Sequence, residues 1–249
     1  MLDIEKFKDH MDDFLELYSN KPIDDNTGGM KSPHLFNMYC VLKELNPKLI
    51  IESGVWKGQG TWLFEQTCPE ASIVSFDVNF QNLKYSSDNV QYVNNDITSV
   101  NWKKVFEDNE QFTPDNTLLF LDDHVNFIER LSFLQNAPFK KIIFEDNYPP
   151  NQGDCISPKK IRECDRCVID SNGNREWIDI PADSKELFEN VISGYQELPP
   201  IYKPDTTRWG DDWGEEYKTD DAHFEFDSLE KDILTDEMYD YTWICYMEK

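Results

Sequence analysis

The segment IIESGVWKGQG, residues 50–60, joins an apolar run to an acid and a group of glycines. The apolar run predicts a buried strand that ends at Glu52, and TWLFEQ, which begins at Thr61, has a helical pattern. Of the ten glycines in the chain, three lie in this turn: Gly54, Gly58 and Gly60. Such a turn either lets a ligand approach the backbone or makes a tight corner between a strand and a helix.

Strand and helix patterns alternate outward from this turn. Apolar runs typical of strands buried on both faces lie at 49–52, 73–77, 118–122 and 141–145. Helical spacing separates them, and the final YTWICYME alternates as an antiparallel edge strand does. These patterns predict an α/β fold with a doubly wound, mostly parallel Rossmann-like sheet and an antiparallel last strand.

The regular alternation of strand and helix patterns ends after residue 150, and we expect the chain to have four parts. We expect N-terminal helices and a loop in 1–47, the sheet core in 48–150, a C-terminal cap insertion in 151–240 and a final edge strand of the core in 241–249. Within the cap, VIDSNGNREWIDI reads as a hairpin around an Asn-Gly turn, and DSKELFENVISG as a helix that Gly194 stops.

The net charge and composition of the chain argue against some classes of binding partner. The formal charge of −25 over 249 residues repels phosphate backbones and anionic membranes, so we expect no nucleic acid and no membrane partner. No apolar run is long enough for a membrane span, and the acidic amphipathic N-terminus does not resemble a signal peptide. The three clustered cysteines, Cys155, Cys164 and Cys167, fit reduced thiols better than a zinc site, which favours a cytoplasmic location.

Each of five predicted strands ends in acids: Glu52, Asp77, Asp96, Asp122 with Asp123, and Glu145 with Asp146. Ligands of open α/β sheets bind beyond the carboxyl ends of the strands, so these acids should converge on one crevice. A nucleoside cofactor would use the acid after the second strand, 17 residues beyond the last glycine (77 minus 60). A divalent cation would use several oxygens from adjacent strands, whereas helix caps and solvated charge explain the same acids without a ligand. The glycine spacing does not match the G-x-G-x-x-G pattern, which counts against NAD.

The motifs IIESGVWKGQGTW, FDVN, FLDDH and FEDNYPP together resemble the class I S-adenosylmethionine-dependent methyltransferases. Within this class the chain resembles the metal-dependent O-methyltransferases of the catechol and macrocin type. The resemblance covers residues 26–150 and the last strand. It implies S-adenosylmethionine and Mg²⁺ as cofactors.

The resemblance also implies roles for individual residues. Cofactor binding would fall to Glu52, Gly54, Gly58, Gly60, Asp77 at the ribose, Asp96 at the adenine, and Gly29 and Met30 in the loop NTGGMK over the methionine end. The metal ligands would be Asp122, Asp146 and Asn147. The catechol family has a catalytic lysine where this chain has Val125, so His124 becomes the candidate base beside Asp122, although a structural histidine is an equally good interpretation.

The sequence indicates the substrate that accepts the methyl group less clearly than it indicates the cofactor. Tyr202, Trp209, Trp213 and Tyr217 could stack on a sugar or pack together in a core. The acidic 205–240 segment favours a neutral or cationic small molecule or sugar with a hydroxyl group. Two alternatives stay open, a hydroxylase or oxidoreductase of the same fold and a non-catalytic module that binds a metal or ligand. The oligomeric state is not predicted.

Overall fold

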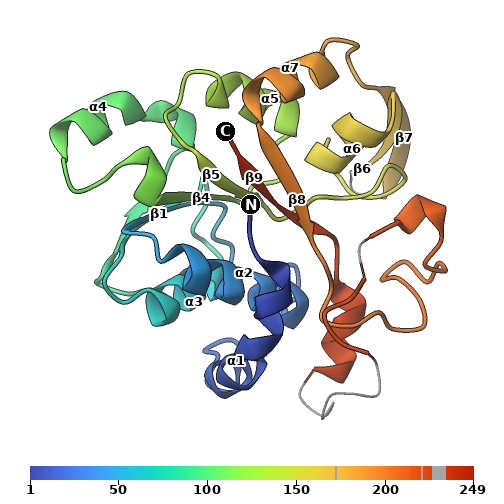
Figure 1. Cartoon of the computed structure of the whole chain (residues 1–249), viewed down its shortest axis with the longest axis horizontal. Helices are drawn as coiled ribbons and strands as arrows, with labels where there is room; N and C mark the ends of the chain where they lie inside the picture. Colours follow the sequence, from blue (N-terminus) through green and yellow to red (C-terminus); the bar gives the residue numbers. More distant parts are fainter. Residues whose placement is uncertain (172, 220, 226–233) are drawn as a thin grey trace.

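A seven-stranded sheet organises the computed structural model, which describes residues 1–171, 173–219, 221–225 and 234–249 (Figure 1). Its strand order is β3-β2-β1-β4-β5-β9-β8. The strands are β1 Leu49–Ser53, β2 Ser72–Phe76, β3 Val90–Val93, β4 Thr117–Leu121, β5 Lys141–Phe144, β8 Gly194–Leu198 and β9 Ile244–Glu248. The first five pair in parallel, and β9 is antiparallel to both neighbours. The predicted doubly wound sheet with an antiparallel last strand is confirmed.

Helices cover both faces of this sheet (Figure 1). They are α1 Met11–Tyr18, α2 Ser32–Leu45, α3 Gln59–Thr67, α4 Trp102–Asp108, α5 Phe127–Leu134, α6 Pro158–Glu163 and α7 Ser184–Val191. Short 3-10 turns occur at η1 Ile4–His10, η2 Ile97–Ser99, η3 Pro114–Asn116, η4 Glu215–Tyr217 and η6 Thr235–Asp240. Helices α1, α2 and α3 lie on one face, and α4, α5 and α7 lie on the other. None of the helices in the described ranges is both long enough and apolar enough to traverse a lipid bilayer.

The central strands are apolar throughout because each contributes to two cores. In β1, Ile50 packs with α1, α2 and α3, whereas Ile51 packs on the side of α5 and α7. Leu118 and Leu119 of β4 divide in the same way. Each fully buried side chain of this size stabilises the fold by about 1.5–3 kcal/mol relative to exposure. The carboxyl ends of these strands are therefore held rigidly.

The prediction of a final edge strand is wrong, because β9 lies between β5 and β8. The alternating pattern suggested one solvated face, but Tyr246 buries its ring and donates its hydroxyl to Glu248 Oε1 at 3.1 Å. The outer strand is β8, which comes from the segment expected to form only a cap. Gly194 opens this strand and does not stop the preceding helix, which ends at Val191.

The rest of the expected cap is a small unit beside the sheet. It contains α6 and the hairpin β6 Arg166–Ser171 with β7 Asn174–Asp179, whose turn residue Asn172 lies outside the described residues. Lys160 is fully buried and fastens this unit, because its Nζ donates to the carbonyls of Cys155 and Val168 at 2.7 and 2.8 Å. All six cysteines are free thiols, and the three clustered ones are among them.

Candidate active site

The order of the strands reverses between β1 and β4, and open α/β sheets bind ligands at such a switch point. Backbone hydrogen bonds hold three strand ends together there: Gly54 N donates to Phe76 O at 2.9 Å, and Asp122 N donates to Ser53 O at 2.8 Å. A cavity of about 430 Å³ lies beyond them, within the size range of small-molecule sites. We call it the nucleoside cavity; its lining includes Gly54, Val55, Trp56, Asp77, Val78, Asn95, Asp96, Asp122 and His124.

Two glycines of the 50–60 segment are required mainly by the tight turn between β1 and α3. Gly54 has φ +91°, and a Cβ there would lie 1.8 Å from the backbone oxygen of Asp122. Gly58 also has φ +91°, and its Cβ would lie 2.5 Å from the backbone oxygen of Tyr85. Both positions need glycine because protein backbone occupies the space. The interpretation of the turn as a tight corner is therefore confirmed for these two glycines, and the cofactor role of Gly54, which also lines the nucleoside cavity, stays a prediction.

Asp77 lies in the wall of the nucleoside cavity, where the ribose prediction needs it. Its Oδ2 accepts from the amides of Val55 and Trp56 at 2.9 and 3.3 Å, and its Oδ1 accepts from Asn79 N at 2.8 Å. The carboxylate thus shapes the loop after β1 as well as facing the cavity. The next residue, Val78, is 75% exposed and gives the cavity an apolar surface.

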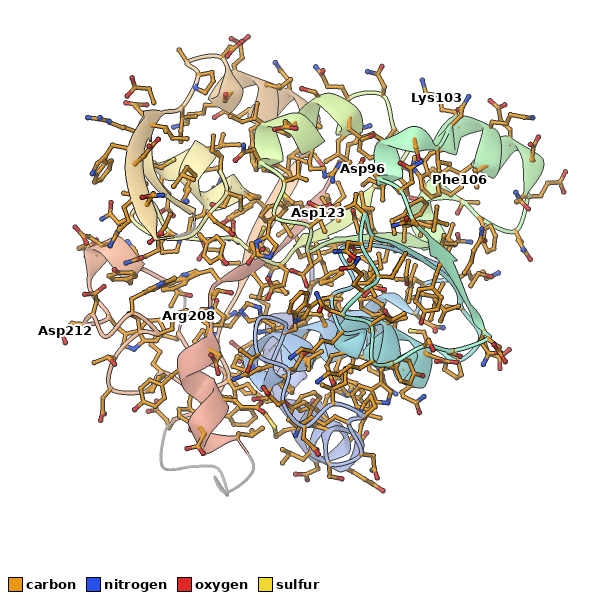
Figure 2. All side chains as sticks on the ribbon, turned by 180° about the vertical axis from the view of Figure 1, so that it is seen from behind. Asp96, Lys103, Phe106, Asp123, Arg208 and Asp212 are labelled. Carbon is orange, nitrogen blue, oxygen red and sulfur yellow. The ribbon has the colours of Figure 1, made fainter. Side chains whose placement is uncertain are left out.

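Asp96 forms an ion pair with an arginine and also lines the nucleoside cavity, so its adenine role stays a prediction. Arg130, whose side chain is 3% exposed, donates to both oxygens of Asp96 at 3.1 and 2.8 Å and to Asp123 Oδ2 at 2.7 Å. Burial opposes the charged form, but hydrogen bonds from Arg130 and Thr98 prevail and lower the pKa of Asp96 to about 2. Asp96 follows β3 and Asp123 follows β4, which are separated in the sheet by β2 and β1; Figure 2 labels both residues. The ion pairs of Arg130 with Asp96 and Asp123 hold this wall of the nucleoside cavity in place.

A second cavity of about 240 Å³ adjoins the first. The two share Gly28, Asp122 and His124. We call the second one the acidic cavity; its lining also includes Lys31, His34, Glu145, Asp146, Tyr148, Arg208 and Asp240. Arg208 reaches it from the C-terminal segment, as Figure 2 indicates. Two compartments therefore meet at the end of β4.

Carboxylates are concentrated at this junction. Ligand atoms of Asp122, His124 and Asp146 all lie within 4.8 Å of one another, which makes this the one such group found in the described part of the chain. Burial, followed by the charges of Glu145 and Asp146, raises the pKa of Asp122 well above its usual value. Burial and the charge of Asp146 likewise raise the pKa of Glu145. Glu145 and Asp146 are buried and Asp122 is half-buried, and acids crowded in this way favour either a shared proton or a bound cation.

Asp146 contributes an oxygen with unused bonding capacity. Its side chain is buried, and His124 Nδ1 lies 3.2 Å from Oδ2. The geometry of that pair does not make a hydrogen bond, and Oδ2 has no hydrogen-bond partner among the described residues. Because buried carboxylate oxygens are nearly always satisfied, this atom is a candidate metal ligand.

Asn147, the third predicted metal ligand, points elsewhere. Its Oδ1 accepts from Lys159 N at 2.9 Å, and its Nδ2 donates to Tyr195 Oη at 2.9 Å. These bonds tie β5 to α6 and β8, and the side chain lines neither cavity. The structure corrects this assignment, and Glu145, one residue before Asp146, lies at the junction in its place.

A histidine from α2 supports Glu145. His34 is buried, and its Nε2 accepts from Thr242 N at 3.0 Å. Its Nδ1 must therefore carry the proton and donate to Glu145 Oε1. Burial lowers the pKa of His34 to about 3, so the ring stays neutral. Sequence inspection missed this pair because its members are 111 positions apart.

His124 does not have the protonation state of a base. Its Nδ1 donates to Asp154 Oδ1 at 3.2 Å; this bond and the charge of Asp146 raise the pKa of His124 to about 11. The imidazolium can donate a proton but cannot accept one, so the predicted base role is not supported. His124 adopts φ +54°, and such backbone strain is frequent at functional sites.

Glu52 lies inside β1 and faces a third, very small cavity with Gly29, Met30 and Gly60. Its Oε2 accepts from Thr61 and Ser75 at 2.6 and 2.5 Å. Burial raises the pKa of Glu52 to about 7 despite these bonds. Trp56, which the sequence analysis did not single out, covers this region and donates from Nε1 to Thr27 O at 3.1 Å.

The aromatic residues proposed to stack on a sugar form a core instead. Trp209, Trp213 and Tyr217 each pack on Trp243, with ring centroids 5.7–6.0 Å apart. Tyr202 is 1% exposed. The packing alternative is therefore confirmed, and none of the four aromatic residues lines either cavity.

No protein-family model matches the chain, and no curated protein matches it. Solved structures with similar folds include CmcI with Mg and SAM (18% identity, 51% of this chain and 58% of CmcI, TM-score 0.38). Another is an O-methyltransferase from Bacillus cereus in complex with SAH, with 13% identity over 97% of this chain and 91% of that one and a TM-score of 0.45. A third is the N-terminal domain of EvdMO1 with SAH bound, with 15% identity over 80% of this chain and 91% of that one and a TM-score of 0.46. The chain spans little more than half the length of CmcI. At these TM-scores the likeness does not by itself assign an activity.

Proposed function

We propose that this chain is an S-adenosylmethionine-dependent, Mg²⁺-assisted O-methyltransferase that acts on a hydroxylated small molecule or sugar. The observation that carries the proposal is the wall shared by the two cavities, made by Gly28, Asp122 and His124. A group passes between two molecules fastest when both are held in contact and in line. The shared wall supports such an arrangement.

The residues of the nucleoside cavity suit the cofactor, which when bound supplies a methyl group on a sulfonium. Asp77 offers carboxylate oxygens to the ribose hydroxyls, and exposed Val78 offers an apolar surface to a purine. Glu52 offers a carboxylate to the ammonium group at the other end. The three residues lie on β1 and directly after β2, so the sheet sets their spacing.

The acidic cavity suits a divalent cation. The fit rests on the buried Oδ2 of Asp146, which makes no hydrogen bond among the described residues, and on the crowding of Asp122 and Glu145 beside it. Asp122 and Asp146 would hold the ion, and oxygen ligands of this kind are those that Mg²⁺ prefers. A bound divalent cation lowers the pKa of an acceptor hydroxyl and neutralises local charge.

The remaining residues of the acidic cavity define the acceptor. A volume of about 240 Å³ suits a single substituted ring, because benzene occupies an engineered cavity of about 150 Å³. His124, fixed by Asp154 through Nδ1, has Nε2 left to donate to the acceptor. Tyr148 and Arg208 complete the lining.

A transfer assay tests this function. The full chain is incubated with S-adenosylmethionine labelled in its methyl group and with single-ring phenols, catechols and sugars, in the presence of Mg²⁺ or EDTA. We expect labelled product only with Mg²⁺, and none from Asp146→Ala. Absence of product across the panel, together with absence of S-adenosylhomocysteine binding, would refute the proposal.

A further inference from the structure

Arg208, labelled in Figure 2, lies in the wall of the acidic cavity. Its guanidinium lies 5.9 Å from the ring centroid of Trp209, and within the described part of the chain it forms no ion pair. Burial is the main cause of the low pKa of His34, another residue of this lining, and the charge of Arg208 lowers that pKa further. The guanidinium therefore acts on the interior of the cavity with its hydrogen-bond donors unused by protein carboxylates.

The turn that carries Arg208 is anchored on both sides of this residue. Thr207 is 2% exposed, and its N–H donates to Asp211 O at 2.8 Å. On the other side, the ring of Trp209 stacks on the buried ring of Trp243, with centroids 6.0 Å apart. Because packed neighbours hold the backbone, Arg208 starts from a fixed point beside the cavity. A group placed in advance loses less conformational freedom when it binds a ligand.

The acids of the C-terminal segment do not cancel this charge. Residues 205–240 contain 14 of them, which is why the sequence favoured a neutral or cationic acceptor. Of the acids in that segment that the structure describes, only Asp240 lines the acidic cavity. Lys31 Nζ lies 2.8 Å from Asp240 Oδ2 and offsets it. A divalent cation would likewise offset the two proposed metal ligands, which leaves the charge of Arg208 available to an anion.

Tyr148 gives the same cavity a rigid aromatic surface. Gly153 lies directly against its ring, since a Cβ on Gly153 would sit 2.0 Å from a ring carbon. The ring of Trp209 lies near it as well, with centroids 6.4 Å apart. Aromatic side chains pack well against other rings, so this surface suits a ring-shaped acceptor.

The chemistry of the guanidinium selects the anion. Its planar fork matches a carboxylate through two parallel hydrogen bonds, and a cavity of about 240 Å³ leaves room for one ring with small substituents. Resting on the proposed function, we propose that the acceptor is a hydroxylated ring that carries a carboxylate. Arg208 binds that carboxylate and directs the hydroxyl toward Asp122 and Asp146. It determines specificity and takes no part in the chemical step.

Two pairs of probes that differ only in charge test the proposal by calorimetry, with S-adenosylhomocysteine and Mg²⁺ present. They are 3,4-dihydroxybenzoate with 3,4-dihydroxybenzamide, and glucuronate with glucuronamide. In at least one pair the wild type should bind the carboxylate roughly tenfold or more tightly than the amide, as expected for hydrogen bonds to a charged group. Arg208→Gln should lose this preference, while its affinity for the amide changes less than about twofold. Arg208→Lys should keep part of the preference, because a lysine retains the charge without the fork.

Arg166→Gln is the matched control. Arg166 lies on the β6–β7 hairpin, where its exposed side chain is 3.5 Å from exposed Asp179, and it lines neither cavity. This variant should keep the preference of the wild type. Both it and Arg208→Gln should bind S-adenosylhomocysteine as the wild type does, because Arg208 is not part of the nucleoside cavity.

Three results would overturn the inference. The first is a wild type that binds the amide as tightly as the carboxylate in both pairs, and the second is a preference that persists in Arg208→Gln. The third is a wild type that binds S-adenosylhomocysteine but neither carboxylate. Wild-type protein that does not bind S-adenosylhomocysteine would refute the proposed function itself, a result distinct from the loss of charge selectivity.

Discussion

The backbone of Gly54 lies against the carbonyl of Asp122 so closely that a Cβ on Gly54 would sit 1.8 Å from that oxygen. The contact joins the end of β1 to the end of β4, and Asp122 follows β4 directly. The residue with the strongest sequence signal is therefore a structural support for a candidate metal ligand. It holds the end of β4 in place and also lines the nucleoside cavity.

Gly54→Ala should destabilise the whole domain. The substitution combines a left-handed backbone, which costs about 1–2 kcal/mol for a non-glycine residue, with a clash against main chain. We expect a loss of about 3 kcal/mol in the free energy of unfolding, measured by urea denaturation. The matched control is Gly210→Ala, which has φ +81° but no atom within 4 Å of its Cβ. Equal losses from the two variants would show that the close approach to Asp122 does not matter.

The ion pair of Asp96 with Arg130 should make stability depend on pH in the acid range. The folded pKa of about 2 lies below the unfolded value of about 3.9. The contribution is thus complete above pH 4 and is lost as the pH falls toward 2. Urea unfolding should show that Asp96→Asn is less stable than the wild type at pH 7 and that the difference shrinks by pH 2.5. A pH-independent difference would contradict this.

Asp115→Asn is the control for that experiment. Asp115 pairs with Lys140 at 2.9 Å, but both side chains are exposed. Exposed ion pairs contribute little to stability, so this variant should resemble the wild type throughout the pH range.

Magnesium should stabilise the protein through Asp146 and not through Asn147. A ligand that binds only the folded state raises the melting temperature. Thermal unfolding should show this rise with millimolar MgCl₂ in the wild type, measured against NaCl of equal ionic strength. Asp146→Ala should lose the response. Asn147→Ala should melt lower, because Lys159 N and Tyr195 Oη lose their partner, yet keep the response. The opposite pattern would restore Asn147 as the ligand.

Asp77→Ala should weaken S-adenosylhomocysteine binding by roughly tenfold or more, since hydrogen bonds to a charged acceptor contribute about 1.5–3 kcal/mol. It should also lower the melting temperature, because the amides of Val55 and Trp56 lose an acceptor. Calorimetry and thermal unfolding separate the two effects. A lower melting temperature with unchanged affinity would reduce Asp77 to a loop support.

The sheet was predictable because strands buried on both faces carry continuous apolar runs, as around Ile50 and Leu118. The acids after these runs could be placed at one crevice because parallel strands end at the same edge. The position of β9 was not predictable, since alternation in Tyr246 and its neighbours looks the same whether an outer strand covers them or not.

The site was predictable only where local sequence determines geometry. Asp122 and Asp146 follow adjacent strands and meet. Asn147 lies one residue further and turns away, because a backbone amide 12 positions later engages it. His34 reaches Glu145 through the packing of α2, and Arg208 reaches the acidic cavity from a turn of the C-terminal segment. Contacts of this kind leave no periodic or motif signal.

Calorimetric titration of the full wild-type chain with S-adenosylhomocysteine tests the proposed activity most directly. We predict saturable binding at one site per chain, retained in Asp146→Ala because the ion serves the acceptor, and weakened by Val78→Asp, which places a charge on the apolar surface of the nucleoside cavity. An absence of saturable heat at millimolar ligand, with or without Mg²⁺, would contradict the assignment of this chain as an S-adenosylmethionine-dependent methyltransferase.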